Sequence, residues 1–247
     1  MSLRSHFALR LPIALAAWLA ATPAVQAASL QVAPTSVQLT AEESAQGLWL
    51  SNSGDKPLQA QVRVFRWHQK DGEDLLDPSD RIAISPPMLE LAPHSRQLVR
   101  IIRLDAAPRS TEDTYRVLVD ELPAADATAS ASGLQFVLRY SVPIFVKPSA
   151  AAAPVLHARL IRDASAPALE VVNQGSEHAQ LVDLHFVASD GTRAAIADGL
   201  AGYVLPGQRK RWPLPPALVR ANGAFKATIN GEPIAQSLSL EAQAPSP

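Results

Sequence analysis

Residues 133–148, GLQFVLRYSVPIFVKP, constrain the fold more than any other part of the sequence. Apolar residues alternate with other residues here, and a period of two places them on one face of a β-strand that is longer than the average of about five or six residues. Because proline cannot donate to a β-ladder, Pro143 predicts that part of this strand lies at a sheet edge. An exposed apolar edge of this length aggregates unless something pairs with it, so the sequence predicts a strand offered to a partner. The residues of the apolar face are Leu134, Phe136, Leu138, Tyr140, Val142, Ile144 and Val146.

The first residues have the features of a secretory signal. Arg4 and Arg10 come before an apolar run at residues 11–21, and Val25-Gln26-Ala27 has the small-x-small form of a signal-peptidase site. The run is too short to span a bilayer, and no later segment approaches about 18 unbroken apolar residues. We therefore expect a signal peptide at residues 1–27, cleavage after Ala27, and a mature protein without a membrane span. Its location is the periplasm if the cell is a Gram-negative bacterium.

Composition excludes several classes of protein. The chain has no cysteine, so an exported protein of this kind must be stabilised by its hydrophobic cores and not by disulfides. The formal net charge is −1 and the basic residues are scattered, which gives no electrostatic surface for a nucleic acid. The tightest basic run, Arg209-Lys210-Arg211, is interpreted as a solvated turn.

Strand patterns separated by turn residues fill residues 30–148, without a convincing helical period. About seven short strands in such a length are typical of an immunoglobulin-like β-sandwich. A small-residue linker, SAAAAP at residues 149–154, follows, and strand patterns then resume. The sequence therefore predicts an all-β protein with a first domain at residues 28–148 and a smaller β-sandwich at residues 155–247.

The sequence gives little support for catalysis. It contains no cysteine nucleophile, Gly-x-Ser-x-Gly elbow, phosphate-binding glycine loop or His-Glu-x-x-His pair. His178 and His185 share no tight ligand spacing with a third histidine or carboxylate, which favours ordinary sandwich positions over a zinc site. Asp71-Gly72-Glu73-Asp74 is interpreted as a hairpin turn, because the other ligands of a calcium loop are missing. We predict no enzymatic activity, no cofactor and no metal.

Several short motifs occur together as they do in one known family. They are Pro34-Thr35-Ser36-Val37, Ser51-Asn52, Pro86-Pro87 with Leu91-Ala92-Pro93, Tyr115-Arg116, Asp120-Glu121-Leu122-Pro123, Ile144-Phe145-Val146-Lys147-Pro148, Val172-Asn173-Gln174-Gly175 and Gly202-Tyr203-Val204-Leu205-Pro206-Gly207. With these motifs the whole mature chain resembles the PapD-like periplasmic chaperones of chaperone–usher pilus assembly. The resemblance implies two immunoglobulin-like sandwiches in an L shape, with a cleft between them.

The resemblance also implies a task. Such a chaperone holds a secreted pilus subunit whose sandwich lacks its last strand, inserts its own long strand into the gap, and delivers the subunit to an outer-membrane usher. Backbone pairing fixes the register, and alternate apolar side chains that enter the subunit's groove supply most of the burial energy. By resemblance, the donor side chains are Leu134, Phe136, Leu138 and Tyr140.

The sequence differs from the usual family pattern at the site that grips the subunit's terminal carboxylate. Most members use an arginine in the first strand and a lysine late in the long strand, but the matching positions here are Ser36 and Pro143. Tyr115-Arg116 together with SVPIFV at residues 141–146 instead resembles the archaic branch, which is associated with spore-coat-U-like subunits. An arginine can bind a carboxylate through two hydrogen bonds, so Arg116 is the first candidate anchor and Arg103 the second. The alternative is that each is an ordinary surface arginine.

The resemblance further implies an ion-pair network that fixes the angle between the domains. Lys147 matches the family's basic residue before proline, Glu121 matches an acidic residue near the junction, and Glu232 is a possible third member from the second domain. The alternative is that these are solvated side chains, since surface ion pairs contribute only about 0–1 kcal/mol.

Two other function classes stay open. One is an exported adhesin or structural subunit that polymerises through the same edge strand, although such a subunit should lack a strand or carry a free N-terminal donor segment. The other is a ligand-binding sandwich, which needs an aromatic platform. Trp49, Trp67 and Trp212 are too far apart in the sequence to show such a platform, although folding can bring them together.

Overall fold

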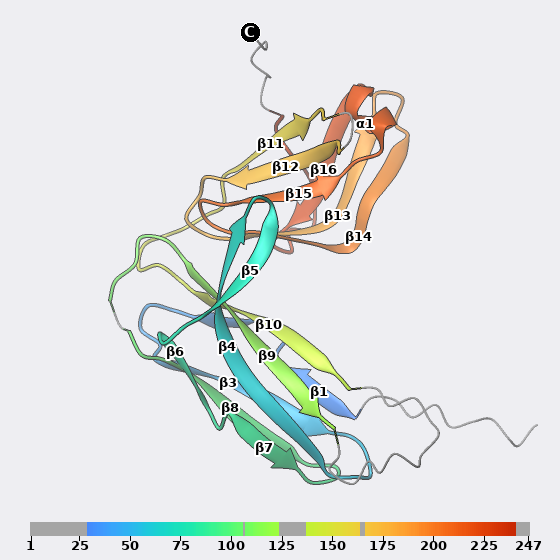
Figure 1. The fold of residues 1–247 in the computed structure, drawn as a ribbon. Helices are drawn as coiled ribbons and strands as arrows, with labels where there is room; N and C mark the ends of the chain where they lie inside the picture. Colours follow the sequence, from blue (N-terminus) through green and yellow to red (C-terminus); the bar gives the residue numbers. More distant parts are fainter. Residues whose placement is uncertain (1–28, 106, 124–136, 164–165, 241–247) are drawn as a thin grey trace, which may run out of the picture.

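The computed structural model describes residues 29–105, 107–123, 137–163 and 166–240, and its regular structure is almost entirely β-strand (Figure 1). The strands form two sandwiches, the first from β1 to β10 and the second from β11 to β17. Among these residues the one helix is α1 (Pro216–Arg220), and no helix is long and apolar enough to cross a membrane. The prediction of an all-β protein with two immunoglobulin-like sandwiches is confirmed.

The first sandwich packs two sheets face to face. One sheet has the strand order β1-β3-β8-β6, and the other has the order β2-β10-β9-β4-β5, with β7 added beside β4. β2 and β10 are parallel, and the other strand pairs of this sandwich are antiparallel. The strands are β1 (Leu30–Ala33), β2 (Val37–Leu39), β3 (Ala45–Asn52), β4 (Leu58–Lys70), β5 (Glu73–Pro78), β6 (Ile82–Ser85), β7 (Met88–Leu91), β8 (Arg96–Arg103), β9 (Asp113–Leu122) and β10 (Arg139–Val146).

Alternation along each strand decides which side chains fill the first core. Val62 on β4, Val117 on β9 and Ile144 on β10 are buried in one apolar cluster between the sheets. Each fully buried side chain of this size contributes about 1.5–3 kcal/mol relative to an exposed one. A core of this kind is what a chain without cysteine needs for its stability.

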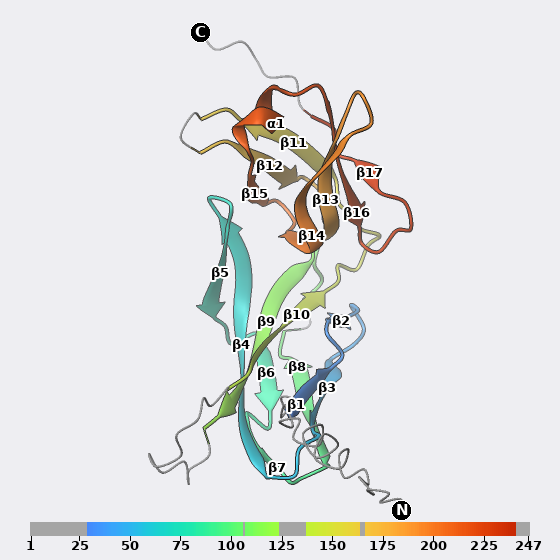
Figure 2. The ribbon, with the colours of Figure 1, turned by 90° about the vertical axis from the view of Figure 1, so that its right-hand side faces the viewer.

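β4 and β5 form a hairpin that extends beyond the first sandwich towards the second domain (Figure 2). Its two-residue turn, Asp71-Gly72, has φ angles of 55° and 89°. Positive φ at both positions is the geometry of a type I′ turn, which suits an Asp-Gly pair. The hairpin turn predicted from the sequence is therefore present, whereas β5 itself was not predicted because its residues are all exposed and show no alternation.

The second sandwich packs a sheet of order β11-β12-β15 against a sheet of order β14-β13-β16-β17. Its apolar core includes Leu169, Leu181, Phe186 and Phe225 and is separate from the first core. The strands are β11 (Leu156–Ile161), β12 (Ala168–Asn173), β13 (Ala179–Ala188), β14 (Arg193–Val204), β15 (Arg209–Pro213), β16 (Gly223–Ile229) and β17 (Gln236–Ser237).

The basic run Arg209-Lys210-Arg211 begins β15, so its interpretation as a solvated turn was wrong. Its charges have partners that are distant in the sequence. Lys210 Nζ lies 2.8 Å from Asp74 of the β4–β5 hairpin, and Arg211 Nε lies 2.6 Å from Glu170 on β12. These ion pairs connect the basic run to the β4–β5 hairpin and to β12.

The two sandwiches lie at an angle to one another, which gives the molecule a bent outline (Figure 1). The N-terminal end of β9 and the C-terminal end of β10 both reach the junction with the second domain (Figure 2). The opposite end of β10 points away from the second domain. The long strand thus connects the junction to the far end of the first sandwich.

Candidate functional site

β10 has an edge that is only partly paired. One side of the strand pairs with β9 along its whole length. The other side pairs with β2 at three positions only, which are Ile144, Phe145 and Val146. Within the part of the chain that the structure describes, no strand pairs with this side at residues 139–143. Pro143 lies in this stretch, and the backbone there is available to a further strand.

Two of the four predicted donor side chains, Leu138 and Tyr140, lie in the described part of the chain, on the face of the long strand that continues the protein's own core. Leu134 and Phe136 lie outside the described residues. Leu138 and Tyr140 are partly buried against the first core, and the Tyr140 hydroxyl donates a 2.6 Å hydrogen bond to the carbonyl oxygen of Leu30. Further along the same face, Ile144 is fully buried. Leu138 and Tyr140 therefore lie where the core face of the strand reaches the solvent.

Arg116 lies on the opposite face of the same sheet. On β9, Arg116 is the direct cross-strand neighbour of Pro143 on β10, and such neighbours project to the same face of the sheet. The guanidinium carbon lies 3.8 Å from the centre of the Trp67 ring and 5.4 Å from that of Tyr203 in the second domain. Such stacking of a guanidinium on aromatic rings is a favourable cation–π contact.

The Arg116 charge has no ion-pair partner among the described residues. Its one hydrogen bond is a long contact of 3.4 Å from Nη1 to the carbonyl oxygen of Ser141. Burial disfavours the charged form and lowers the pKa of Arg116, although Tyr203 and Asp74 oppose this effect from a distance. Arg116 remains a cation at any physiological pH, and the arrangement leaves its donors available to an anion.

Arg103, the second candidate anchor, is already engaged. Its two terminal nitrogens donate to the carbonyl oxygens of Thr40 and Ala41, at 3.2 and 2.7 Å. These contacts tie the end of β8 to the loop after β2. They give Arg103 a local structural role that the sequence did not indicate.

An aromatic cluster joins the two domains beside Arg116. Trp67 and Phe145 of the first domain pack against Tyr203 and Leu205 of the second, and all four are buried. The Trp67 and Tyr203 rings meet edge to face, with centroids 5.3 Å apart. The sequence analysis named Trp67 only as a tryptophan of a possible ligand platform and did not place it at the domain junction, although it lies on the outer face of a predicted strand.

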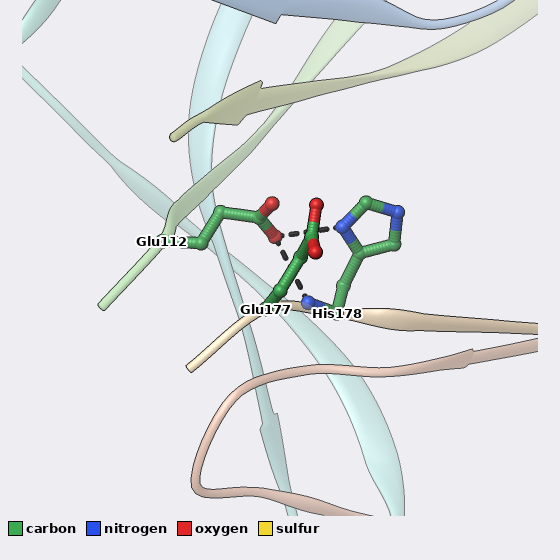
Figure 3. A group of neighbouring side chains, drawn as sticks. All are labelled: Glu112, Glu177 and His178. Carbon is green, nitrogen blue, oxygen red and sulfur yellow. Dashed lines mark hydrogen bonds and ion pairs between the residues drawn. The ribbon is translucent and has the colours of Figure 1, made fainter. Parts of the chain in front are cut away.

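Charged residues form a second contact between the domains (Figure 3). Glu112, just before β9, accepts a 2.8 Å hydrogen bond from Nδ1 of His178, which lies in the loop before β13. Its backbone N–H donates to the carbonyl oxygen of Ser176, at 2.9 Å. Lys147, at the end of β10, lies 3.3 Å from the carboxylate of Glu177 in the same loop.

The acidic residues at this junction differ from those expected. Glu121 lies near the other end of β9, where its carboxylate contacts the backbone N–H of Leu138 in the first domain. Glu232 is exposed in the turn after β16 and, among the described residues, forms no ion pair. The expected positions of Glu121 and Glu232 at the junction are therefore wrong. The contacts between the domains lie beside the N-terminal end of β9, next to Glu112, and not at the end that carries Glu121.

The β4–β5 hairpin makes a third contact with the second domain. The side chain of Gln69 donates to the carbonyl oxygen of Tyr203 at 2.8 Å and accepts from the backbone N–H of Leu205 at 3.1 Å. Asp74 accepts from Lys210, at 2.8 Å. The backbone N–H of Gln69 also donates to the side chain of Gln208. These polar contacts connect the hairpin to residues 203–210 of the second domain.

Residues 29–152 match a protein family described as the pili and flagellar-assembly chaperones, PapD N-terminal domain. The match covers the first sandwich, including β10 and Arg116. No curated protein sequence matches the chain.

Solved structures include many similar chains. One belongs to the pre-assembly complex of the chaperone CsuC with the tip adhesion subunit CsuE, from archaic chaperone–usher Csu pili of Acinetobacter baumannii. It has a TM-score of 0.70 and 23% identity, over 86% of this chain and 98% of that chain. The E. coli chaperone DraB has a TM-score of 0.60 and 20% identity, over 86% and 97% of the two chains. A chain from the complex of the Salmonella enterica SafA pilin with the SafB chaperone has a TM-score of 0.59 and 17% identity, over 81% and 89%. These similarities show that the two-sandwich fold is shared along nearly the whole described chain.

Proposed function

Because the chain belongs to the family of pili and flagellar-assembly chaperones with a PapD N-terminal domain, we propose that it is a periplasmic chaperone for the subunits of a pilus or fimbria. It binds a secreted subunit whose sandwich lacks a strand, supplies that strand, and delivers the subunit to an outer-membrane usher. It reaches the periplasm after cleavage of residues 1–27. It works without a cofactor and catalyses no reaction.

The free edge of β10 is the observation that carries this proposal. Residues 139–143 are paired on the β9 side and unpaired on the other side within the described residues. An incoming strand that forms hydrogen bonds there extends the sheet of the first domain by one strand. The strand of the chaperone then fills the gap in the sandwich of the subunit.

The donor side chains in this proposal are Leu134, Phe136, Leu138 and Tyr140. Leu138 and Tyr140 support it by their position at the border of the core, since both keep part of their surface exposed. A subunit that covers them removes the remaining apolar surface from water. Full burial is worth about 1.5–3 kcal/mol for a large apolar side chain, and a partly buried one gains a fraction of this.

We assign the anchor for the subunit's terminal carboxylate to Arg116. The two usual cationic positions carry Ser36 and Pro143, and Arg116 is the neighbour of Pro143 on the adjacent strand. The positive charge is thus displaced by one strand while staying on the same face of the sheet. Trp67 holds the guanidinium from one side, which leaves its edge to a carboxylate. Arg103 is the less suitable candidate because its donors are used by backbone carbonyl groups.

The proposed subunit is a small secreted protein of the spore-coat-U type. Two features support this class: the Tyr115-Arg116 pair with the 141–146 segment of the archaic branch, and the similarity to a chain from an archaic chaperone–usher complex. The usher is the second partner in the proposal. Nucleic acid and membrane lipid have no part in it.

Periplasmic co-expression tests the proposal directly. A secreted subunit encoded beside this protein is expressed with and without it, and the soluble subunit and the complex are measured by affinity purification. We expect an equimolar complex and loss of the soluble subunit when the chaperone is absent. A subunit that stays soluble and monomeric without this protein would contradict the proposal. Polymers formed by this chain itself would also contradict it and would favour the alternative of a structural subunit.

A further inference from the structure

Three side chains that can bind a metal converge where the two domains meet (Figure 3). Glu112 comes from the segment before β9, and Glu177 and His178 come from the loop before β13. Each offers a ligand atom, and these atoms all lie within 4.8 Å of one another. Sequence reasoning found no sign of this group because its members belong to different domains.

Glu112 is buried, and only one of its two carboxylate oxygens has a hydrogen-bond partner. Its side chain is completely inaccessible to solvent, at 0% exposure. Oε1 accepts hydrogen bonds from Nδ1 and from the backbone N–H of His178, whereas Oε2 has no hydrogen-bond partner. Both oxygens point towards Glu177 and His178 in Figure 3. A buried carboxylate oxygen without a partner is costly, and a cation at this point removes the cost.

The surrounding charges favour an additional cation. Glu177 brings a second carboxylate close to Glu112, and Lys147 Nζ, 3.3 Å from Glu177, balances only one of the two negative charges. The His178 ring stacks on Phe145 with centroids 3.6 Å apart and planes 4° from parallel. This stacking fixes the direction of the ring nitrogens, as the surroundings of a metal-binding histidine normally do.

We propose that Glu112, Glu177 and His178 bind a divalent transition-metal ion, with Zn²⁺ as the best match. One imidazole nitrogen and two carboxylates are a donor set that zinc accepts, with a water molecule as the fourth ligand. Calcium and magnesium prefer all-oxygen sites and are poorer matches. On binding, the neutral ring of His178 carries its proton on Nε2 and not on Nδ1, so that Nδ1 binds the metal in place of its hydrogen bond to Glu112. The ion then connects the two domains through side chains of both.

Zinc binding to the purified mature protein tests this proposal. The protein is treated with a chelator, dialysed, and titrated with ZnCl₂ by calorimetry, with CaCl₂ and MgCl₂ in parallel. We expect one bound zinc per chain, no comparable binding of calcium or magnesium, and a higher thermal midpoint with zinc. Glu112→Gln, Glu177→Gln and His178→Gln should each weaken zinc binding at least about tenfold.

His94→Gln is the matched control, because His94 lies 2.9 Å from Asp55 in an exposed histidine–carboxylate pair. It should bind zinc as the wild type does. Glu177 is partly exposed, so Glu177→Gln keeps the test valid if either buried variant fails to fold as judged by circular dichroism. Absence of zinc binding in the wild type overturns the proposal. It is equally overturned if zinc binding is weakened by His94→Gln and unchanged by Glu177→Gln.

Discussion

Arg116 is a partly buried cation that forms no ion pair among the described residues. Its guanidinium is held against Trp67, and no carboxylate among the described residues lies within ion-pair distance. Burial lowers its pKa but leaves it charged, so an incoming anion gains a charge-assisted hydrogen bond in a partly dehydrated place. We propose that this residue links the fold to the capture of a subunit.

Replacement of Arg116 by alanine should weaken capture of the subunit and leave the fold intact. Loss of a hydrogen bond to a charged group costs about 1.5–3 kcal/mol, which corresponds to about a ten- to hundredfold weaker complex. The dissociation constant of the purified complex is the measurement. Arg116→Lys should restore binding only in part, because lysine keeps the charge and lacks the fork.

Arg100→Ala is the matched control for Arg116→Ala, since Arg100 is an exposed arginine on β8 in the other sheet. It should bind the subunit as the wild type does. Equal affinities of the Arg116→Ala variant and the wild type would assign the carboxylate to another cation. A large fall in its thermal midpoint would instead give Arg116 a structural role.

Among the elements, the β4–β5 hairpin has a role beyond its own sheet. Its turn reaches the second domain, where Gly72 lies against the side chain of Arg211 on β15. A Cβ atom added to Gly72 would come within 2.8 Å of that side chain, and the φ angle of 89° is already unfavourable for other residues. The hairpin thus supports the second domain through its turn as well as through Gln69 and Asp74.

Gly72→Ala should therefore lower the free energy of unfolding more than Gly→Ala at a glycine that has a similar φ angle and no neighbouring side chain. Gly191 offers that comparison, because its φ angle is 87° and nothing lies within 4 Å of the place that a Cβ atom would take. Each substitution should cost about 1 kcal/mol for the backbone alone. Chemical denaturation should show a larger loss for Gly72→Ala. Equal losses would mean that the contact with Arg211 contributes nothing.

β12 carries a buried acid that predicts a dependence on pH. Oε1 and Oε2 of Glu170 accept hydrogen bonds from Arg159 and Arg211, each 2.6 Å long. Burial by itself raises the pKa of Glu170, but the arginines outweigh it and hold the pKa below its ordinary value of 4.5. A lowered pKa stabilises the folded state above pH 4.5, and this stability is lost as the pH falls through the folded-state pKa.

We therefore expect the thermal midpoint of the second domain to fall as the pH is lowered from about 5 to about 2. Glu170→Gln should be less stable at neutral pH and should lose part of this dependence, because its amide does not titrate. Calorimetric scans across the pH range measure both effects. An unchanged slope in the variant would assign the acid sensitivity to other carboxylates.

The sequence predicted elements better than contacts between elements. Alternation grouped Val142, Ile144 and Val146 on one apolar face, which the structure buries in the first core, and Asp71-Gly72 correctly predicted a turn, because both signals are local. Glu121 was chosen for the domain junction although Glu112 lies there, at the other end of β9. At about 3.3 Å per residue these positions are roughly 30 Å apart, and the sequence does not show which end of a strand meets the second domain.

In the molecule as a whole, three groups of contacts among the described residues join the two domains. They are the aromatic cluster around Trp67, the polar contacts of the β4–β5 hairpin, and the group around Glu112 and Lys147. Because these contacts lie at one end of β9 and β10, the opposite part of β10 stays clear of the second domain (Figure 2). The free edge of the long strand therefore lies apart from the contacts that join the domains.

Hydrogen exchange followed by mass spectrometry, on the free protein and on its complex with a subunit, tests whether the subunit pairs with the free edge of the long strand. We predict slower exchange of the backbone amides of residues 134–143 in the complex, with β12 and β13 unchanged. A complex in which residues 134–143 exchange as fast as in the free protein, while another surface becomes protected, would contradict the account.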